Sequence, residues 1–241
     1  MYTGELPPWD SSNFFFDLPG SVQQCTNATW RYQRKEGATP LPTPPYHALL
    51  YTEGYQPYRV QFNNEDIDGE VNWVANLPLG FTFGVSMFDS NNYTGGVLEK
   101  TLEMESRAGC NIQNPLIPST LDVEVTGKPE QCQMVLIDIK NGTSPYKLEI
   151  TPKAAYQKTI RFEANQLGFV LDMSAGMDYW LAVYDSAGHS AVKGSYKVSE
   201  YKDDCLGVAS TVKGQVSTLY PGGAATFTSS ATAASGLPHG L

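Results

Sequence analysis

What this 241-residue chain lacks narrows the classes of protein to which it can belong. It has no run of lysine and arginine residues, and its formal net charge at pH 7 is −9. Nucleic-acid-binding proteins neutralise phosphates with clustered basic side chains, and anionic membrane surfaces attract the same clusters. We therefore expect no nucleic-acid partner. No stretch approaches the roughly 20 apolar residues of a membrane-spanning helix, so we expect membrane attachment only through an anchor outside this chain.

The chain also lacks the motifs of common catalytic and metal sites. It contains three histidines, no G-x-S-x-G motif and no close C-x-x-C pair. A nucleophilic serine needs an adjacent base, and zinc or thioredoxin-type sites need closely spaced cysteines. Asp89-Ser90 and Asp185-Ser186 follow apolar runs, and we interpret both pairs as Asx turns although His189 lies nearby. We therefore expect a protein without enzyme activity and without a cofactor.

What the sequence does contain is one pattern of about a hundred residues that occurs twice, and such a period is typical of tandem domains. Pro45-Tyr46 corresponds to Pro145-Tyr146 at an offset of 100 residues. The segment 83–90 corresponds to 179–186 at an offset of 96. The sequence therefore predicts two tandem copies of one small domain.

The four cysteines follow the same repeat. Cys25 and Cys110 bracket the first copy, and Cys132 and Cys205 bracket the second. Four cysteines allow three pairings, and the repeat selects Cys25–Cys110 and Cys132–Cys205. Disulfides form in oxidising compartments, so this arrangement favours the secretory pathway.

Short apolar runs separated by Pro, Gly, Asn and Asp clusters predict strands and turns, and no segment shows a convincing helical period. In Tyr146–Ile150 the even positions are apolar, so Lys147 and Glu149 are expected to face water. About seven short strands in about 90 residues indicate an immunoglobulin-like sandwich, with a small barrel as the alternative. We expect an all-β chain of two tandem immunoglobulin-like antiparallel β-sandwiches, each closed by one disulfide.

Composition places the expected boundaries along the chain. Residues 13–112 form the first sandwich, 113–120 a proline-containing linker, and 121–208 the second sandwich. Residues 209–241 are rich in Ser, Thr, Ala and Gly, with almost no charge. Such a segment buries too little apolar surface to order itself, so we expect a disordered, O-glycosylated stalk there.

Three N-x-S/T sequons, at Asn27, Asn92 and Asn141, are expected glycosylation sites. The chain starts without the basic and apolar regions of a signal peptide. We therefore expect it to be the mature ectodomain of a secreted protein that carries a non-native Met1.

The acidic segment after residue 63 is the candidate metal site. Asn64, Asp66 and Asp68 occupy alternate positions before Gly69, as in the first half of a calcium-binding loop. The acidic residue expected at position 12 of such a loop is replaced by Ala75. A solvated hairpin turn is the alternative, because turns also favour Asn, Asp and Gly.

Aromatic residues offer a second candidate site. Tyr51, Tyr55 and Tyr58 lie near Gly54 and Pro57, and we expect them to form an exposed aromatic loop able to contact a glycan.

A separate aromatic residue points to a further contact. Trp180 faces opposite to Tyr179 and Leu181 in the predicted strand, so one of these two faces must be solvated, contacted by a partner or packed on the other domain.

The second copy runs from Cys132 through Pro145-Tyr146 and an aromatic strand ending at Asp185-Ser186-Ala187-Gly188 to Cys205. This order resembles a repeat of fungal secreted and cell-surface proteins. The first copy is similar, with Asn92 in place of the glycine. The resemblance implies a β-sandwich repeat followed by a Ser/Thr-rich stalk and an anchor, and most members have no assigned activity.

These observations together predict a non-enzymatic fungal cell-surface ectodomain. Its two sandwiches would serve adhesion, cell-wall organisation or protein interaction, with a cell-wall polysaccharide or another surface protein as partner. A carbohydrate-binding module that recognises wall glycans through exposed aromatic loops is the alternative.

Overall fold

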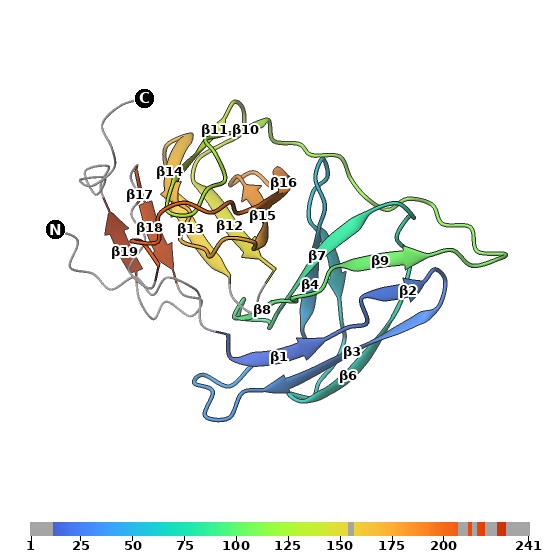
Figure 1. Ribbon diagram of the computed structural model, residues 1–241. Coiled ribbons are helices and arrows are strands. Elements are labelled where there is room, and N and C mark those ends of the chain that lie inside the picture. Colours follow the sequence, from blue (N-terminus) through green and yellow to red (C-terminus); the bar gives the residue numbers. More distant parts are fainter. Residues whose placement is uncertain (1–11, 154–156, 207–211, 214–215, 220–225, 230–241) are drawn as a thin grey trace.

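The computed structural model describes residues 12–153, 157–206, 212–213, 216–219 and 226–229 (Figure 1). All regular elements within these residues are β-strands. The described residues hold no helix, and therefore none long and apolar enough to cross a membrane.

The first sandwich consists of two sheets. The smaller sheet has the order β1-β3-β6, formed by β1 (Phe14–Asp17), β3 (Asn27–Arg34) and β6 (Gly69–Val74). The larger sheet has the order β2-β9-β7-β4-β5 and contains β2 (Ser21–Gln23), β9 (Leu102–Glu105), β7 (Thr82–Phe88), β4 (His47–Tyr51) and β5 (Tyr58–Gln61). A further strand, β8 (Thr94–Val97), also pairs with β7.

The second sandwich repeats this plan. Its smaller sheet has the order β10-β11-β14-β17, from β10 (Val123–Thr126), β11 (Met134–Ile139), β14 (Gln166–Val170) and β17 (Val212–Lys213). Its larger sheet has the order β16-β15-β12-β13-β18-β19. The strands are β16 (Ser190–Lys197), β15 (Asp178–Tyr184), β12 (Tyr146–Pro152), β13 (Lys158–Phe162), β18 (Val216–Leu219) and β19 (Thr226–Ser229).

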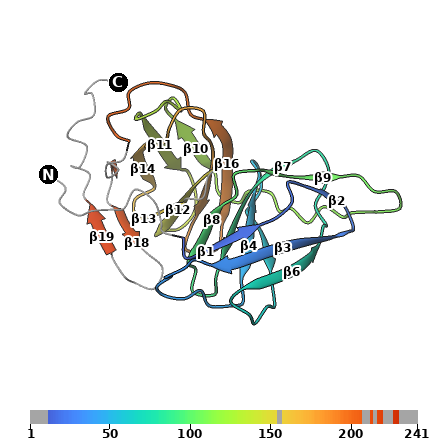
Figure 2. The same ribbon diagram turned by 60° about the horizontal axis from the view of Figure 1, so that its bottom comes forward.

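Strand order confirms the predicted fold class. The order β1-β3-β6 matches β10-β11-β14, and β9-β7-β4-β5 matches β16-β15-β12-β13. Three strands facing four, with hydrogen-bonded neighbours that are distant in sequence, is the arrangement of an immunoglobulin-like sandwich. Figures 1 and 2 show the two sandwiches side by side, with the connection from β9 to β10 running along one side of the molecule.

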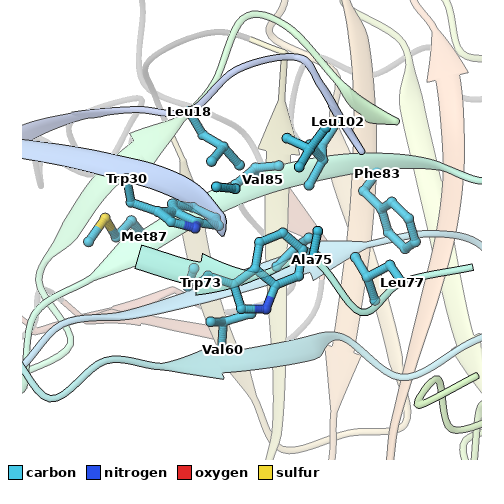
Figure 3. Packing of buried hydrophobic residues seen from close by; sticks show 14 of the residues in the cluster. Leu18, Trp30, Val60, Trp73, Ala75, Leu77, Phe83, Val85, Met87 and Leu102 are labelled. Carbon is cyan, nitrogen blue, oxygen red and sulfur yellow. The ribbon is translucent and has the colours of Figure 1, made fainter. Parts of the chain in front are cut away.

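Each sandwich encloses its own apolar core. In the first, Trp30 packs at ring-centroid distances of 5.3 Å from Phe62 and 6.1 Å from Trp73. Figure 3 shows the two tryptophans between the sheets, with Val60 and Val85 close by. The second core is largely aliphatic and includes Val135, Ile137, Ile139, Leu148, Ile150 and Leu181. Strand alternation explains both cores, because every second residue of β3 and β11 points inward.

The predicted disulfide pairing is confirmed. Cys25 is bonded to Cys110 and Cys132 to Cys205, so one bridge closes each sandwich. Cys25 and Cys132 both adopt a left-handed backbone conformation, with φ of 60° and 59°. The two bridges therefore begin from equivalent turns.

Three strands lie in the segment 209–241, for which the sequence predicts a stalk. β17 pairs with β14, β18 with β13, and β19 with β18, all antiparallel. Without these strands the edges of β13 and β14 would present unpaired backbone groups, and β18 and β17 satisfy these groups by backbone pairing. The other residues predicted to form the stalk lie outside the described part of the chain.

Candidate functional site: the junction between the sandwiches

The larger sheets of the two sandwiches meet through their outer faces. Tyr51 of β4 packs with Trp180 and Ala182 of β15 and with Val192 of β16, in a buried cluster separate from both cores. Alternation along β15 produces this arrangement, because Trp180 and Ala182 point away from the second core while their neighbours point into it. Of the alternatives for Trp180, packing on the other domain is therefore confirmed.

Gly84 allows the two sheets to come this close. It lies on β7, next to Tyr51 in the register of β4 and β7. A Cβ at position 84 would lie 2.8 Å from Cε3 of Trp180, closer than real contacts of that kind. The indole of the second sandwich therefore rests directly on the backbone of the first.

A buried carboxylate lies beside this apolar contact. Glu149 of β12 is 3% exposed and accepts hydrogen bonds from the hydroxyls of Tyr51 (3.2 Å) and Tyr184 (3.0 Å). Lys147 Nζ lies 3.1 Å from the other carboxylate oxygen, and it also lies over the Tyr184 ring. The Tyr51 hydroxyl is also 2.7 Å from Ser86 Oγ. Both oxygens of Glu149 therefore have partners, as a buried charge requires.

Burial, followed by the charge of Glu149, raises the pKa values of Tyr51 and Tyr184 well above the ordinary value for tyrosine. Both phenols therefore stay protonated and act as donors to the carboxylate over the physiological pH range. The expectation that Glu149 faces water was wrong. The strand alternation was correct, but the other sandwich covers this face.

His47 shares the outer face of β4 with Tyr51, because the two residues are four positions apart on one strand. It is buried and stacks on Phe88 with ring centroids 5.3 Å apart. Burial lowers the pKa of His47 to about 4, and the positive charges of Arg59 and Lys147 act in the same direction. His47 is therefore neutral at pH 7 and adds no charge beside the junction.

The predicted linker is bonded to both sandwiches. The backbone N–H of Gln56 donates to the carbonyl of Ile117 (2.8 Å), and that of Ser119 donates to Gly54 (3.0 Å). The N–H of Thr120 then donates to Ser190 of the second sandwich (2.9 Å). The segment 113–120 thus runs along the junction and is hydrogen-bonded to both sandwiches.

The two sandwiches are also hydrogen-bonded to each other directly through their backbones. The N–H of Val192 in β16 donates to the carbonyl of Tyr55, in the turn between β4 and β5, over 3.1 Å. The two sandwiches are therefore joined by backbone hydrogen bonds as well as by side-chain packing.

The Asp-Ser pairs form turns, as predicted. In the second sandwich Asp185 accepts backbone hydrogen bonds from Ala187, His189 and Thr143 at 2.7–2.9 Å. His189 Nδ1 also lies 2.9 Å from Asp185, whereas Ser186 donates its hydroxyl hydrogen to the Thr143 carbonyl. Burial alone would raise the pKa of Asp185, but the side-chain bond from His189 and the backbone bonds lower it to about 2.

The first sandwich contains the same turn without the histidine. Asp89 accepts backbone hydrogen bonds from Asn91, Tyr93 and Thr43, and Ser90 donates to the Thr43 carbonyl. Here burial outweighs the backbone bonds and raises the pKa of Asp89. In both turns the carboxylate ties the end of one strand to the start of β4 or β12, and the serine hydroxyl is used structurally.

The structure brings only two of the three candidate calcium ligands together. Asn64 and Asp66 line a groove of about 420 Å³, and the Asn64 side chain is bonded to backbone groups of Tyr46 and Asp66. Asp68 instead accepts hydrogen bonds from the backbone N–H and the guanidinium of Arg34 at 2.7–2.8 Å. In the described part of the chain, no group of three or more His, Cys, Asp or Glu residues is placed to hold a metal ion.

The expected aromatic loop does not form a single exposed surface. Tyr51 is fully buried in the junction, so it is unavailable to a glycan. Tyr55 is half-buried and packs edge-on against Phe81, with ring centroids 5.5 Å apart. Tyr58 is half-buried and its hydroxyl is hydrogen-bonded to Asn76. The prediction failed for Tyr51 because strand alternation directs it to the face that the second sandwich covers.

The three sequon asparagines are exposed. Asn27 is the first residue of β3, whereas Asn92 and Asn141 lie in connections between strands. The Asn141 carboxamide is bonded to backbone groups of Asp122 and Thr120.

No family model and no curated protein matches the chain. Among solved structures, the FN1–FN3 domains of chicken CNTN1 match with 15% sequence identity and a TM-score of 0.26. The match covers 81% of this chain and 69% of that one. Strand order and the two separate cores define the immunoglobulin-like fold of both sandwiches.

Proposed function

We propose that this chain is a non-enzymatic ectodomain of the fungal cell surface that presents two β-sandwiches as one rigid unit, for adhesion, cell-wall organisation or protein interaction. The junction is the observation that carries the proposal. Trp180 rests on Gly84, and Glu149 is held by phenols from both sandwiches. A fixed pair of domains suits presentation, because its binding loops keep one orientation and ordering them on binding costs less entropy.

Two further features support an extracellular setting. Each sandwich has one disulfide, and such bridges persist in oxidising compartments. The sequon asparagines are exposed, so they are accessible for glycan attachment. Among the described residues, three carboxylates have altered pKa values: Asp68 is paired with Arg34, and Asp89 and Asp185 hold turns together. These structural roles support a protein that binds without turnover.

The test of this proposal is bead adhesion. The secreted chain is immobilised on beads, and attachment to purified wall polysaccharides and to intact fungal cells is measured. We expect attachment by the native chain and a marked loss for Trp180→Ala, which separates the sandwiches but leaves both cores intact. The Tyr201→Ala variant is the control, because Tyr201 is exposed and outside the junction cluster.

Two results would contradict the proposal. One is absence of attachment to any fungal surface or wall polymer. The other is turnover of generic glycoside, ester or peptide substrates that a single Asp or Glu substitution abolishes.

A second candidate function is wall-glycan recognition through Tyr55. Tyr55 and Phe81 form an edge-on aromatic pair that is half-exposed beside the linker, and exposed aromatic rings stack on sugar faces. On a glycan array, Tyr55→Ala should lose binding to a β-glucan, chitin or mannan that Tyr201→Ala retains. Equal binding by both variants would remove this candidate.

A further inference from the structure

The outer face of the β1-β3-β6 sheet carries an exposed apolar residue next to a sequon. Asn27 and Thr29 of β3 point outward, because Ala28 and Trp30 point into the core. Val74 of β6 is the direct cross-strand partner of Asn27 and is 57% exposed. The side chains of cross-strand partners lie on the same face, within about 4.5–5.5 Å at their Cβ atoms.

A groove of about 540 Å³ lies on the other side of Asn27, toward β1 and β2. Asn27, Thr29 and Arg31 of β3 form one side of it, and residues between Asp17 and Gln23 form the other. Val74 is not among its lining residues, so the groove does not share the flank of Asn27 that carries Val74.

The second sandwich differs at the equivalent positions. Alignment of the first cysteine of each copy places Met134 at the position of Asn27 and Leu136 at that of Thr29. The cross-strand partner of Met134 is Val170, which is only 5% exposed. The apolar residue of β14 is thus buried, whereas the equivalent Val74 of β6 stands open to solvent beside a sequon.

We propose that an N-linked glycan on Asn27 packs on this face, with its first N-acetylglucosamine in contact with Val74. The apolar C–H face of a pyranose would remove Val74 from water, and burial of apolar surface is favourable by about 25 cal/mol per Å². The inference rests on the proposed secretion of the chain, since N-glycans are attached in that pathway.

The experiment uses the full chain secreted from a eukaryotic host. Glycopeptide mass spectrometry first measures occupancy at each sequon. The folded glycoprotein is then treated with a peptide N-glycosidase, and release from Asn27 and Asn92 is followed over time. We expect release from Asn27 to be several-fold slower in the folded chain, and the two rates to converge after reduction and denaturation.

Asn27 lies in a strand and Asn92 in a loop, and this difference could by itself slow the glycosidase at Asn27. Two variants distinguish that effect from packing of the glycan on the protein. Val74→Gln removes the proposed apolar contact without creating a new sequon at Asn72, and it should speed release from Asn27 toward the rate at Asn92. Leu136→Gln is the matched control, because Leu136 is also an exposed apolar residue on an outer sheet face, and it should leave the rate unchanged.

Three outcomes would overturn the inference. If Asn92 or Asn141 carries a glycan and Asn27 does not, the proposed glycan on this face does not exist, whereas secretion of the chain is still supported. Equal release rates in the folded chain, or a slow rate unchanged by Val74→Gln, would show that the glycan does not contact this face. Bare sequons together with reduced cysteines in the chain isolated from its natural source would instead overturn the proposed function itself.

Discussion

At the scale of single residues, Glu149 determines how the two sandwiches hold together. Its buried carboxylate accepts a hydrogen bond from one phenol of each sandwich and pairs with the ammonium of the partly exposed Lys147. Buried charges are stabilising only while their partners are present, and removing one partner leaves the others unsatisfied. The junction is therefore sensitive to a change that leaves both hydrophobic cores untouched.

Glu149→Ala should lower the free energy of unfolding by about 2–3 kcal/mol, because it leaves the Tyr184 phenol without its acceptor, the Tyr51 phenol with Ser86 alone and Lys147 without its partner. The measurement is urea denaturation. Glu124→Ala is the control, because Glu124 pairs with Lys140 at the surface, and such pairs contribute about 0–1 kcal/mol. Equal effects of the two substitutions would contradict the role assigned to Glu149.

Asp185 gives a prediction for acid pH. Its pKa of about 2 in the folded chain lies below the ordinary value of about 3.9 for an unfolded Asp. A depressed pKa contributes stability that is present above pH 4 and is lost as the pH falls toward 2. His189→Ala removes a bond that lowers this pKa, so it should reduce the melting temperature at pH 5 and make the fall between pH 4 and pH 2 shallower.

Thermal unfolding of the native chain and His189→Ala across this pH range checks the prediction. The equivalent Asp89 lacks a histidine partner and its pKa is raised, so Asp89→Asn should not reproduce the effect. Parallel pH profiles for the native chain and His189→Ala would contradict the assignment.

At the scale of elements, close approach of β7 and β15 depends on a single glycine. Gly84→Ala places a methyl group against the Trp180 indole and should destabilise the chain by about 1–3 kcal/mol. If the clash is the cause, adding Trp180→Ala should remove the effect, so that the double variant matches Trp180→Ala alone. A double-mutant cycle of unfolding free energies measures this coupling. Additive effects would show that Gly84 matters for another reason.

Much of the architecture at this scale could be predicted because its signals are local or repeated. Strand alternation places the core residues of β12, the repeat selects the disulfides, and Asp-Ser pairs after strands predict turns. Packing of Trp180 on the other domain was among the predicted alternatives, but the places of Tyr51 and Glu149 in the junction were missed, because the strand pattern does not distinguish a face covered by another domain from a face covered by water. Lys147 and Glu149 alternate as polar residues facing water would, and Tyr51 lies beside a glycine-containing turn.

The available signal for the junction was an excess of apolar residues on both faces of β15. Trp180 and Ala182 alternate with Tyr179 and Leu181, so both faces of this strand required cover. The strands β17, β18 and β19 left no comparable signal, because their Ser/Thr-rich segment pairs through backbone groups.

At the scale of the whole molecule, the junction and the linker together hold the two sandwiches in one relative orientation. Backbone bonds from Gln56, Ser119 and Thr120 fix the linker, and the Trp180 and Glu149 contacts fix the sheets. Contacts between domains within a chain are often small and allow relative motion. Here an apolar cluster, a satisfied buried charge and backbone bonds combine, and this combination predicts a pair of domains that moves as one body.

Rotational diffusion of the two sandwiches, measured from ¹⁵N relaxation of their backbone amides, tests this claim most directly. One shared correlation time, appropriate to the mass of both domains together, is the predicted result. Trp180→Ala should split it into two shorter values while each core stays folded. Two distinct short correlation times in the native chain would show that the sandwiches tumble independently, and the proposal of a rigid presenting unit would then be wrong.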